Sequence, residues 1–166
     1  MARASSLWII NRCPPVAASW SERPEFYTHD GENPIGVPIE GFADKTAAEA
    51  ARKKLERAAR ETTPIGPFLR SRLPDGTGAI AAAAKAANVP PPDYAAAGPE
   101  AKPIRQGRSV TYPADYSAYM DRLELAVAAW WASVAADITP EANAILWNTL
   151  FPKFRFYSLS RVLVPA

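Results

Sequence analysis

Apolar positions near the two ends of the chain form short runs rather than spaced stripes. Leu7 to Arg12 is one such run, closed by Cys13-Pro14-Pro15, and it predicts a strand that is buried on both faces. The segment from Phe154 to Val164 is rich in aromatic and β-branched residues, which favour strands. Neither of its faces is purely polar, so we expect it to lie inside a sheet, beside Leu7–Arg12.

Two further extended segments flank a stretch that is rich in turn residues. Residues 26–29 and 36–42 lie on either side of Asp30-Gly31-Glu32-Asn33-Pro34. This arrangement predicts a β-hairpin. Pro38 favours an edge position, because proline lacks the N–H that a central strand needs.

A helix is predicted to begin at Thr46 and to run to about Glu61. Thr46-Ala47-Ala48-Glu49 matches a capping box, and Thr63-Pro64 ends the helical pattern. At about 100° per residue, one side collects small apolar residues, which we expect to pack on the sheet: Ala47, Ala48, Ala51, Leu55, Ala58 and Ala59. The other side is charged, and we expect it to face solvent: Glu49, Arg52, Lys53, Glu56, Arg57 and Arg60.

Residues 64–112 form an insertion that is rich in proline and alanine. Residues 78–88 predict a short helix, because alanine has the highest helix propensity, but only Ile80 would anchor it. Residues 89–110 are typical of extended chain. Because residues 74–112 hold few large apolar side chains, we expect them to be mobile in the isolated protein.

A long helix is predicted to begin near Pro113, which fits a first helical turn. Its apolar residues fall within an arc of roughly 120°: Tyr116, Tyr119, Met120, Leu123, Val127, Trp130, Trp131 and Val134. A stripe of this width has room for two adjacent tryptophans. We therefore expect Trp130 and Trp131 to be core residues.

The next helix is predicted to begin at Pro140, with Thr139 as its N-cap. Its expected core stripe is Ala142, Ile145, Leu146, Thr149 and Leu150. Trp147 lies outside that stripe and, with Phe151 one turn later, makes a second apolar face. Such a face has to be covered, and tryptophan is enriched at interface hot spots. We expect Trp147 and Phe151 to contact a partner.

These elements predict an α+β fold in a single domain, residues 1–166. The expected architecture is a small, mainly antiparallel sheet made of the N-terminal strand, the hairpin and the C-terminal strand. At least three helices cover it, with the Pro/Ala-rich insertion between them.

Composition limits the classes of function. Hydrophobic residues make up 48% of the chain and charged residues 22%, which is typical of a globular protein rather than a disordered one. The longest apolar run, residues 125–136, is well short of the roughly 20 residues that a membrane span needs. The single cysteine excludes an internal disulfide. We expect a soluble protein of the cytoplasm.

Residues that carry catalysis are sparse. His29 is the only histidine, and with Asp30 and Glu32 it could touch a metal, but a polar turn is the interpretation we favour because no second His or Cys cluster completes a site. Cys13 has no histidine near it in the sequence and fits a buried structural thiol. We expect no catalytic residue, no metal and no cofactor, and hence no enzyme activity.

Three functions are compatible with the sequence, and we give them in the order in which we favour them. The first is a protein–protein interaction module, or an accessory subunit of a larger assembly, whose partner is another protein or a second copy. The second is a nucleic-acid-associated factor using the basic helix 45–61. The net charge of the chain, +2, does not itself indicate nucleic acid. The third is a small enzyme with an unrecognised site. The candidate nucleic-acid face is Arg52, Lys53, Arg57 and Arg60.

Overall fold

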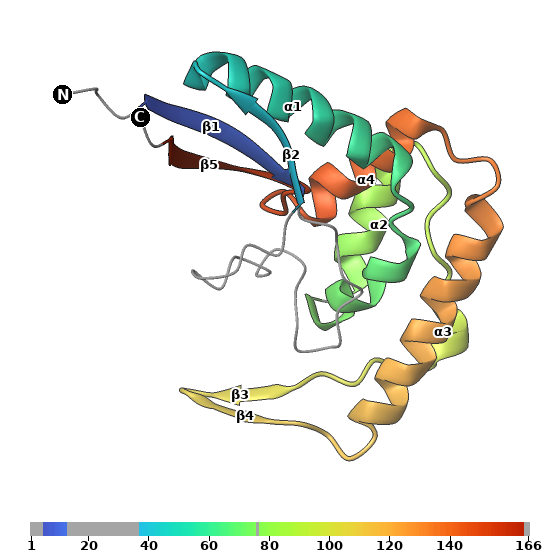
Figure 1. Ribbon diagram of the computed structural model, residues 1–166. Coiled ribbons are helices and arrows are strands. Elements are labelled where there is room, and N and C mark those ends of the chain that lie inside the picture. The colour runs from blue at the N-terminus through green and yellow to red at the C-terminus, as the bar shows by residue number, and fades with distance from the viewer. Residues whose placement is uncertain (1–4, 13–36, 76, 165–166) are drawn as a thin grey trace.

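The fold is organised around a three-stranded antiparallel sheet in the order β2-β1-β5. In this computed structural model, which describes residues 5–12, 37–75 and 77–164, the strands are β1 (Ser5–Arg12), β2 (Val37–Phe42) and β5 (Tyr157–Val164). Strand β1 pairs with β5 along its whole length and with β2 on its other side (Figure 1). The predicted α+β class and the antiparallel sheet are therefore confirmed.

The C-terminal strand is beside β1, as predicted, but it is not inside the sheet. Strand β1 takes the central position, and β5 lies at an edge among the described strands. Pro38 lies on the other edge strand, opposite Asn11, which agrees with the edge position expected for a proline. The first half of the predicted hairpin, residues 26–29, and its turn lie outside the described residues.

Helix α1 (Lys45–Thr62) packs on one face of this sheet (Figure 1). Its N-cap is Asp44, whose carboxylate accepts a hydrogen bond from the Ala47 amide at 2.8 Å, rather than Thr46 of the predicted capping box. A short carboxylate at the N-cap satisfies one of the free amides of the first turn. The helix therefore begins one residue before the predicted start.

The buried side of α1 differs from the predicted stripe of small residues. Arg52 and Arg60 are buried together with Ala48, whereas Ala47 and Ala58 are exposed. The helix is rotated because the two arginines cover apolar surface with their stems and find acceptors for their guanidinium groups inside the molecule. Two of the six charged residues expected to face solvent, Arg52 and Arg60, are therefore buried.

Residues 64–112 are a packed part of the fold over most of their length. They form the 3₁₀ helix η2 (Gly66–Asp75), helix α2 (Thr77–Ala86) and the short η3 (Ala95–Ala97), followed by strands β3 (Ile104–Gln106) and β4 (Ser109–Thr111). Residues 89–110, for which extended chain is expected, contain η3 as well as β3 and β4, and Ala97 and Ala101 are buried. The core residues that residues 64–112 contribute are Ile65, Phe68, Leu69, Leu73, Ile80, Ala83, Ala84, Ala87, Ala97 and Ala101.

Helix α3 (Tyr116–Val134) closes the other side of this core, with the stripe that the sequence predicts. Trp130 is 6% exposed, and its indole Nε1 donates a hydrogen bond to the Pro90 carbonyl at 2.6 Å. Trp131 is partly buried and lies against Gly66, where a Cβ would overlap the indole ring. Trp130 and Trp131 therefore hold two separate parts of residues 64–112, at Pro90 and at Gly66, against α3.

Helix α4 (Pro140–Leu150) begins at the predicted cap, since the Thr139 hydroxyl accepts a hydrogen bond from the Ala142 amide. Its buried stripe is rotated from the predicted one, and Ile145 is 38% exposed. Hydrogen bonds account for this rotation. The Asn143 side-chain amide donates to the carbonyls of Arg60 and Thr63, so this side of the helix faces inward. The stripe is Asn143, Leu146, Trp147 and Leu150.

Candidate functional site

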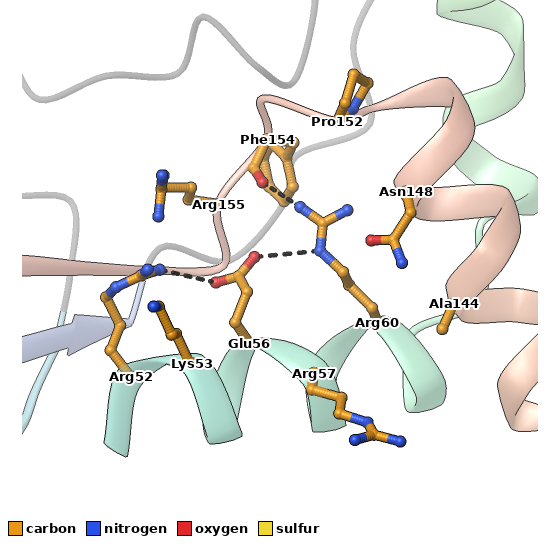
Figure 2. A pocket seen from close by; sticks show the side chains of 10 residues that line it. All are labelled: Arg52, Lys53, Glu56, Arg57, Arg60, Ala144, Asn148, Pro152, Phe154 and Arg155. Atoms are coloured by element: carbon orange, nitrogen blue, oxygen red, sulfur yellow. Dashed lines mark hydrogen bonds and ion pairs between the residues drawn. The ribbon is translucent and has the colours of Figure 1, made fainter. Parts of the chain in front are cut away.

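A cleft of about 290 Å³ lies between α1, α4 and the connection from α4 to β5 (Figure 2). Five cationic side chains and one carboxylate line it, which makes it strongly basic. The lining residues are Arg52, Lys53, Glu56, Arg57, Arg60, Ala144, Asn148, Pro152, Phe154 and Arg155.

Glu56 is the anchor at the centre of the cleft. Its two carboxylate oxygens accept hydrogen bonds from the backbone amides of Phe156 and Tyr157, at 2.9 and 3.0 Å. One oxygen is also 3.9 Å from Arg52, and the other is 3.5 Å from Arg60 (Figure 2). The Glu56 side chain is only 13% exposed, and this set of donors compensates its charge, so Glu56 fastens the start of β5 onto α1.

Arg60 caps the end of α4. Its guanidinium donates hydrogen bonds to the carbonyl oxygens of Phe151 and Phe154, which follow the last turn of that helix. Phe151 is the C-cap residue of α4, so its carbonyl has no intrahelical partner, and Phe154 lies just beyond the helix. Burial lowers the pKa of Arg60 from its ordinary value, and the Glu56 carboxylate opposes that shift. Arg60 thus has a structural role, because it links α1 to the end of α4.

Arg52 closes the cleft on the side of the sheet. Its guanidinium binds the Glu49 carboxylate at 2.7 Å and donates to the Tyr157 carbonyl oxygen at 3.5 Å. The hydrogen bond from Arg52 is the main reason that the pKa of Glu49 is lowered. Two of the four residues of the predicted nucleic-acid face, Arg52 and Arg60, are therefore occupied inside the protein.

The other two residues of that predicted face reach solvent. The Arg57 side chain is 83% exposed and pairs with Glu61 at 3.2 Å. Lys53 is exposed, as are Asn148 and Arg155, which complete the open side of the cleft (Figure 2). Sequence analysis missed Asn148 and Arg155, because no local pattern indicates that residue 155 returns to face residue 53.

Trp147 and Phe151 are core residues, which corrects their assignment to a partner surface. Both are 0% exposed. The Trp147 indole donates to the Thr63 carbonyl oxygen at 2.7 Å. Its ring centroid is 5.0 to 5.7 Å from the ring centroids of Phe68, Phe151, Phe154 and Phe156. The chain itself supplies the cover that we expected from a partner.

A second feature of the surface is a hairpin arm, which we define as residues 102–112. Strands β3 and β4 project away from the helices and the main sheet (Figure 1), and residues 104–112 are all exposed. The tight turn contains Gly107 with φ of 59°, a conformation that favours glycine at the first central position of a hairpin turn. At the base, the Tyr112 ring centroid is 5.0 Å from that of Tyr116.

The remaining candidates for chemistry fall elsewhere. Cys13, His29, Asp30 and Glu32 lie outside the described residues. Within residues 5–12, 37–75 and 77–164, no three His, Cys, Asp or Glu side chains gather in a way that could hold a metal ion. None of the helices in the same ranges combines the length and the apolar character needed to cross a bilayer.

Comparison with known proteins gives no relative, since no protein-family model, no curated protein and no solved structure matches the chain. Any assignment of function therefore rests on the two surfaces of the chain itself, the basic cleft and the hairpin arm.

Proposed function

We propose that the protein is a non-catalytic interaction module that binds a partner protein through the hairpin arm. The observation that carries this proposal is the exposure of three large apolar side chains on so short an element. Ile104 is 56% exposed, Val110 is 39% exposed and Tyr112 is 60% exposed. Clustered exposed apolar side chains tend to mark contact surfaces, whereas isolated ones are common on any protein.

The positive charges of the hairpin arm indicate that the partner surface carries acidic side chains. The arm carries Lys102, Arg105 and Arg108, and residues 101–114 contain no acidic side chain. Lys102 pairs with Glu100 at 3.1 Å, which leaves Arg105 and Arg108 near the tip as the cations available to a partner. By the register of the arm, Val110 shares one face with Arg105, and Ile104 lies on the other face. An apolar side chain beside an arginine fits a partner surface that combines apolar and acidic side chains.

The backbone of the arm supports the same proposal. A two-stranded hairpin alone is marginally stable in water, and within the described part of the chain neither outer edge of β3 and β4 pairs with a further strand. A partner that adds a strand, or that covers one face, satisfies these groups and stabilises the arm. Nucleic acid is the less favoured ligand, because large apolar side chains contribute little to phosphate contacts.

The test combines cross-linking with a matched pair of variants. The full-length protein would be purified from its native source after cross-linking, and cross-linked positions in the protein and its partner would be mapped. With that partner purified, the double variant Ile104→Ser/Tyr112→Ser should weaken binding by at least about 2 kcal/mol, since hot-spot aromatics carry this much. Leu125→Ser is the control, because Leu125 is 70% exposed on α3 but lies outside the arm.

Three outcomes would overturn the proposal. In the first, cross-links map away from residues 102–112. In the second, the arm variant and Leu125→Ser have the same affinity. In the third, the arm binds an oligonucleotide with a steep salt dependence, and the protein partner binds the arm variant as well as it binds the wild type.

A further inference from the structure

We propose that the basic cleft is a second binding site, which takes the phosphate group of a small molecule between Lys53 and Arg155. It is distinct from the hairpin arm, and the interaction with a partner protein does not depend on it. Asn148, on the facing helix α4, lines the same cleft on the other side of Arg60 (Figure 2).

The charges of the cleft do not balance. Glu56 compensates Arg60 and shares Arg52 with Glu49, while Arg57 has Glu61. Lys53 and Arg155 line the same cleft. Glu49 attracts both and binds Arg52 directly, so three carboxylates, Glu49, Glu56 and Glu61, face five cations. The positive charge of Arg155 repels the Arg60 guanidinium and lowers the pKa of Arg60, whereas it attracts the Glu49 carboxylate and lowers the pKa of Glu49. A bound anion relieves the repulsion between Arg155 and Arg60.

The backbone at Lys53 and at Arg155 is held in place by neighbouring hydrogen bonds. Residue 155 lies between two fixed points: Arg60 binds the Phe154 carbonyl oxygen, and Glu56 binds the Phe156 amide. Lys53 is on the same helix as both anchors, so its backbone is fixed relative to them. Preorganisation of this kind reduces the entropy lost on binding. The ion-pair network thereby determines where the two free charges are presented.

The shape and charge of the site select the ligand class. Two uncompensated cations match a dianionic phosphate better than a singly charged carboxylate. The cleft, at about 290 Å³, has room for a phosphate group with a small organic portion. A nucleic-acid strand fits less well: Phe154, the aromatic residue of the lining, is only 4% exposed and offers no ring on which a base could stack.

The test uses inorganic phosphate as the probe, with binding to the full chain followed by calorimetry at constant ionic strength. We expect saturable binding of phosphate, and weaker binding of acetate by at least tenfold. The double variant Lys53→Gln/Arg155→Gln should lose at least tenfold in phosphate affinity. The control, Lys54→Gln/Arg161→Gln, removes two positive charges from exposed positions that do not line the cleft, and it should retain the wild-type affinity.

Thermal unfolding in chloride serves as the folding check, and both double variants should melt close to the wild type because all four side chains are exposed. Equal loss in the two double variants would show a general charge effect and overturn the proposal, as would phosphate binding no tighter than acetate. Two further probes address the source of the phosphate, a short single-stranded oligonucleotide and vesicles containing a phosphoinositide. Tighter binding of either one than of inorganic phosphate, abolished by Lys53→Gln/Arg155→Gln, would replace the small molecule by a polymer or a membrane.

Discussion

Replacing Trp147 with Ala should unfold most of the protein's helical core. The side chain is 0% exposed and is surrounded by four phenylalanine rings. A buried tryptophan removes about 150–250 Å² from water. At about 25 cal/mol per Å², that burial is worth about 4–6 kcal/mol. The lost indole N–H also leaves the Thr63 carbonyl with one donor fewer, although Asn143 still binds it.

That loss is comparable to the whole stability of a domain, which is about 5–15 kcal/mol. Urea unfolding followed by far-ultraviolet circular dichroism would measure it directly. Trp147→Phe is the matched control: it keeps a ring among the phenylalanines and removes the N–H, so it should cost about 1–3 kcal/mol. The order of stability should be wild type, then Trp147→Phe, then Trp147→Ala.

A different result would refute this reasoning. If Trp147→Ala unfolds within about 1 kcal/mol of the wild type, the side chain is not a core residue, because truncations of buried aromatics cost about 3–5 kcal/mol. If that variant also binds the partner protein more weakly, the second apolar face of α4 would again be a candidate interface.

Three further perturbations test other contacts. Arg60→Gln should cost about 3 kcal/mol in urea unfolding, because it removes one of the two cations beside Glu56 and the donors to the Phe151 and Phe154 carbonyls. Lys54→Gln, at an exposed position, should stay within about 0.5 kcal/mol. Gly66→Ala should lower the melting temperature by forcing Trp131 away, while Gly78→Ala in α2 has no atom within 4 Å of its new Cβ and should be neutral or stabilising. Burial raises the pKa of Tyr94 to about 12 from 10.0. Above pH 10 the unfolded chain loses this proton first, so stability should fall between pH 10 and about 12, and Tyr94→Phe should flatten that part of a pH series of urea melts.

Elements with a strong local signal were predictable from the sequence. The stripe on α3 repeats at the helical period over 19 residues, and the start of α4 is marked by Thr139 and Pro140. Both signals depend only on neighbours within one or two turns, so no knowledge of the rest of the fold is needed.

The rotations of α1 and α4 could not be predicted in this way. Arg60 is buried because of a carbonyl 91 positions away, and Asn143 because of one 83 positions away. The basic cleft has the same origin, since Arg155 reaches Lys53 through the tertiary fold. A polar side chain on a helix is therefore ambiguous until its distant acceptors are known. The burial of the Ala-rich α2 was also hard to predict, because small alanine side chains pack closely against a neighbouring helix although few large apolar residues mark the contact.

The pairing of β1 with β5 has a consequence for how the chain is made. Asn11 and Ser160, which share a hydrogen bond across these strands, are 149 positions apart. At synthesis rates of about 5–20 residues per second, one edge of β1 waits roughly 7–30 s for its partner strand to be made. The centre of β1, Leu7 to Ile10, is apolar, and closing so long a loop is slow compared with forming helices. Until β5 is made, this apolar stretch keeps one unpaired edge, and such an edge is open to aggregation.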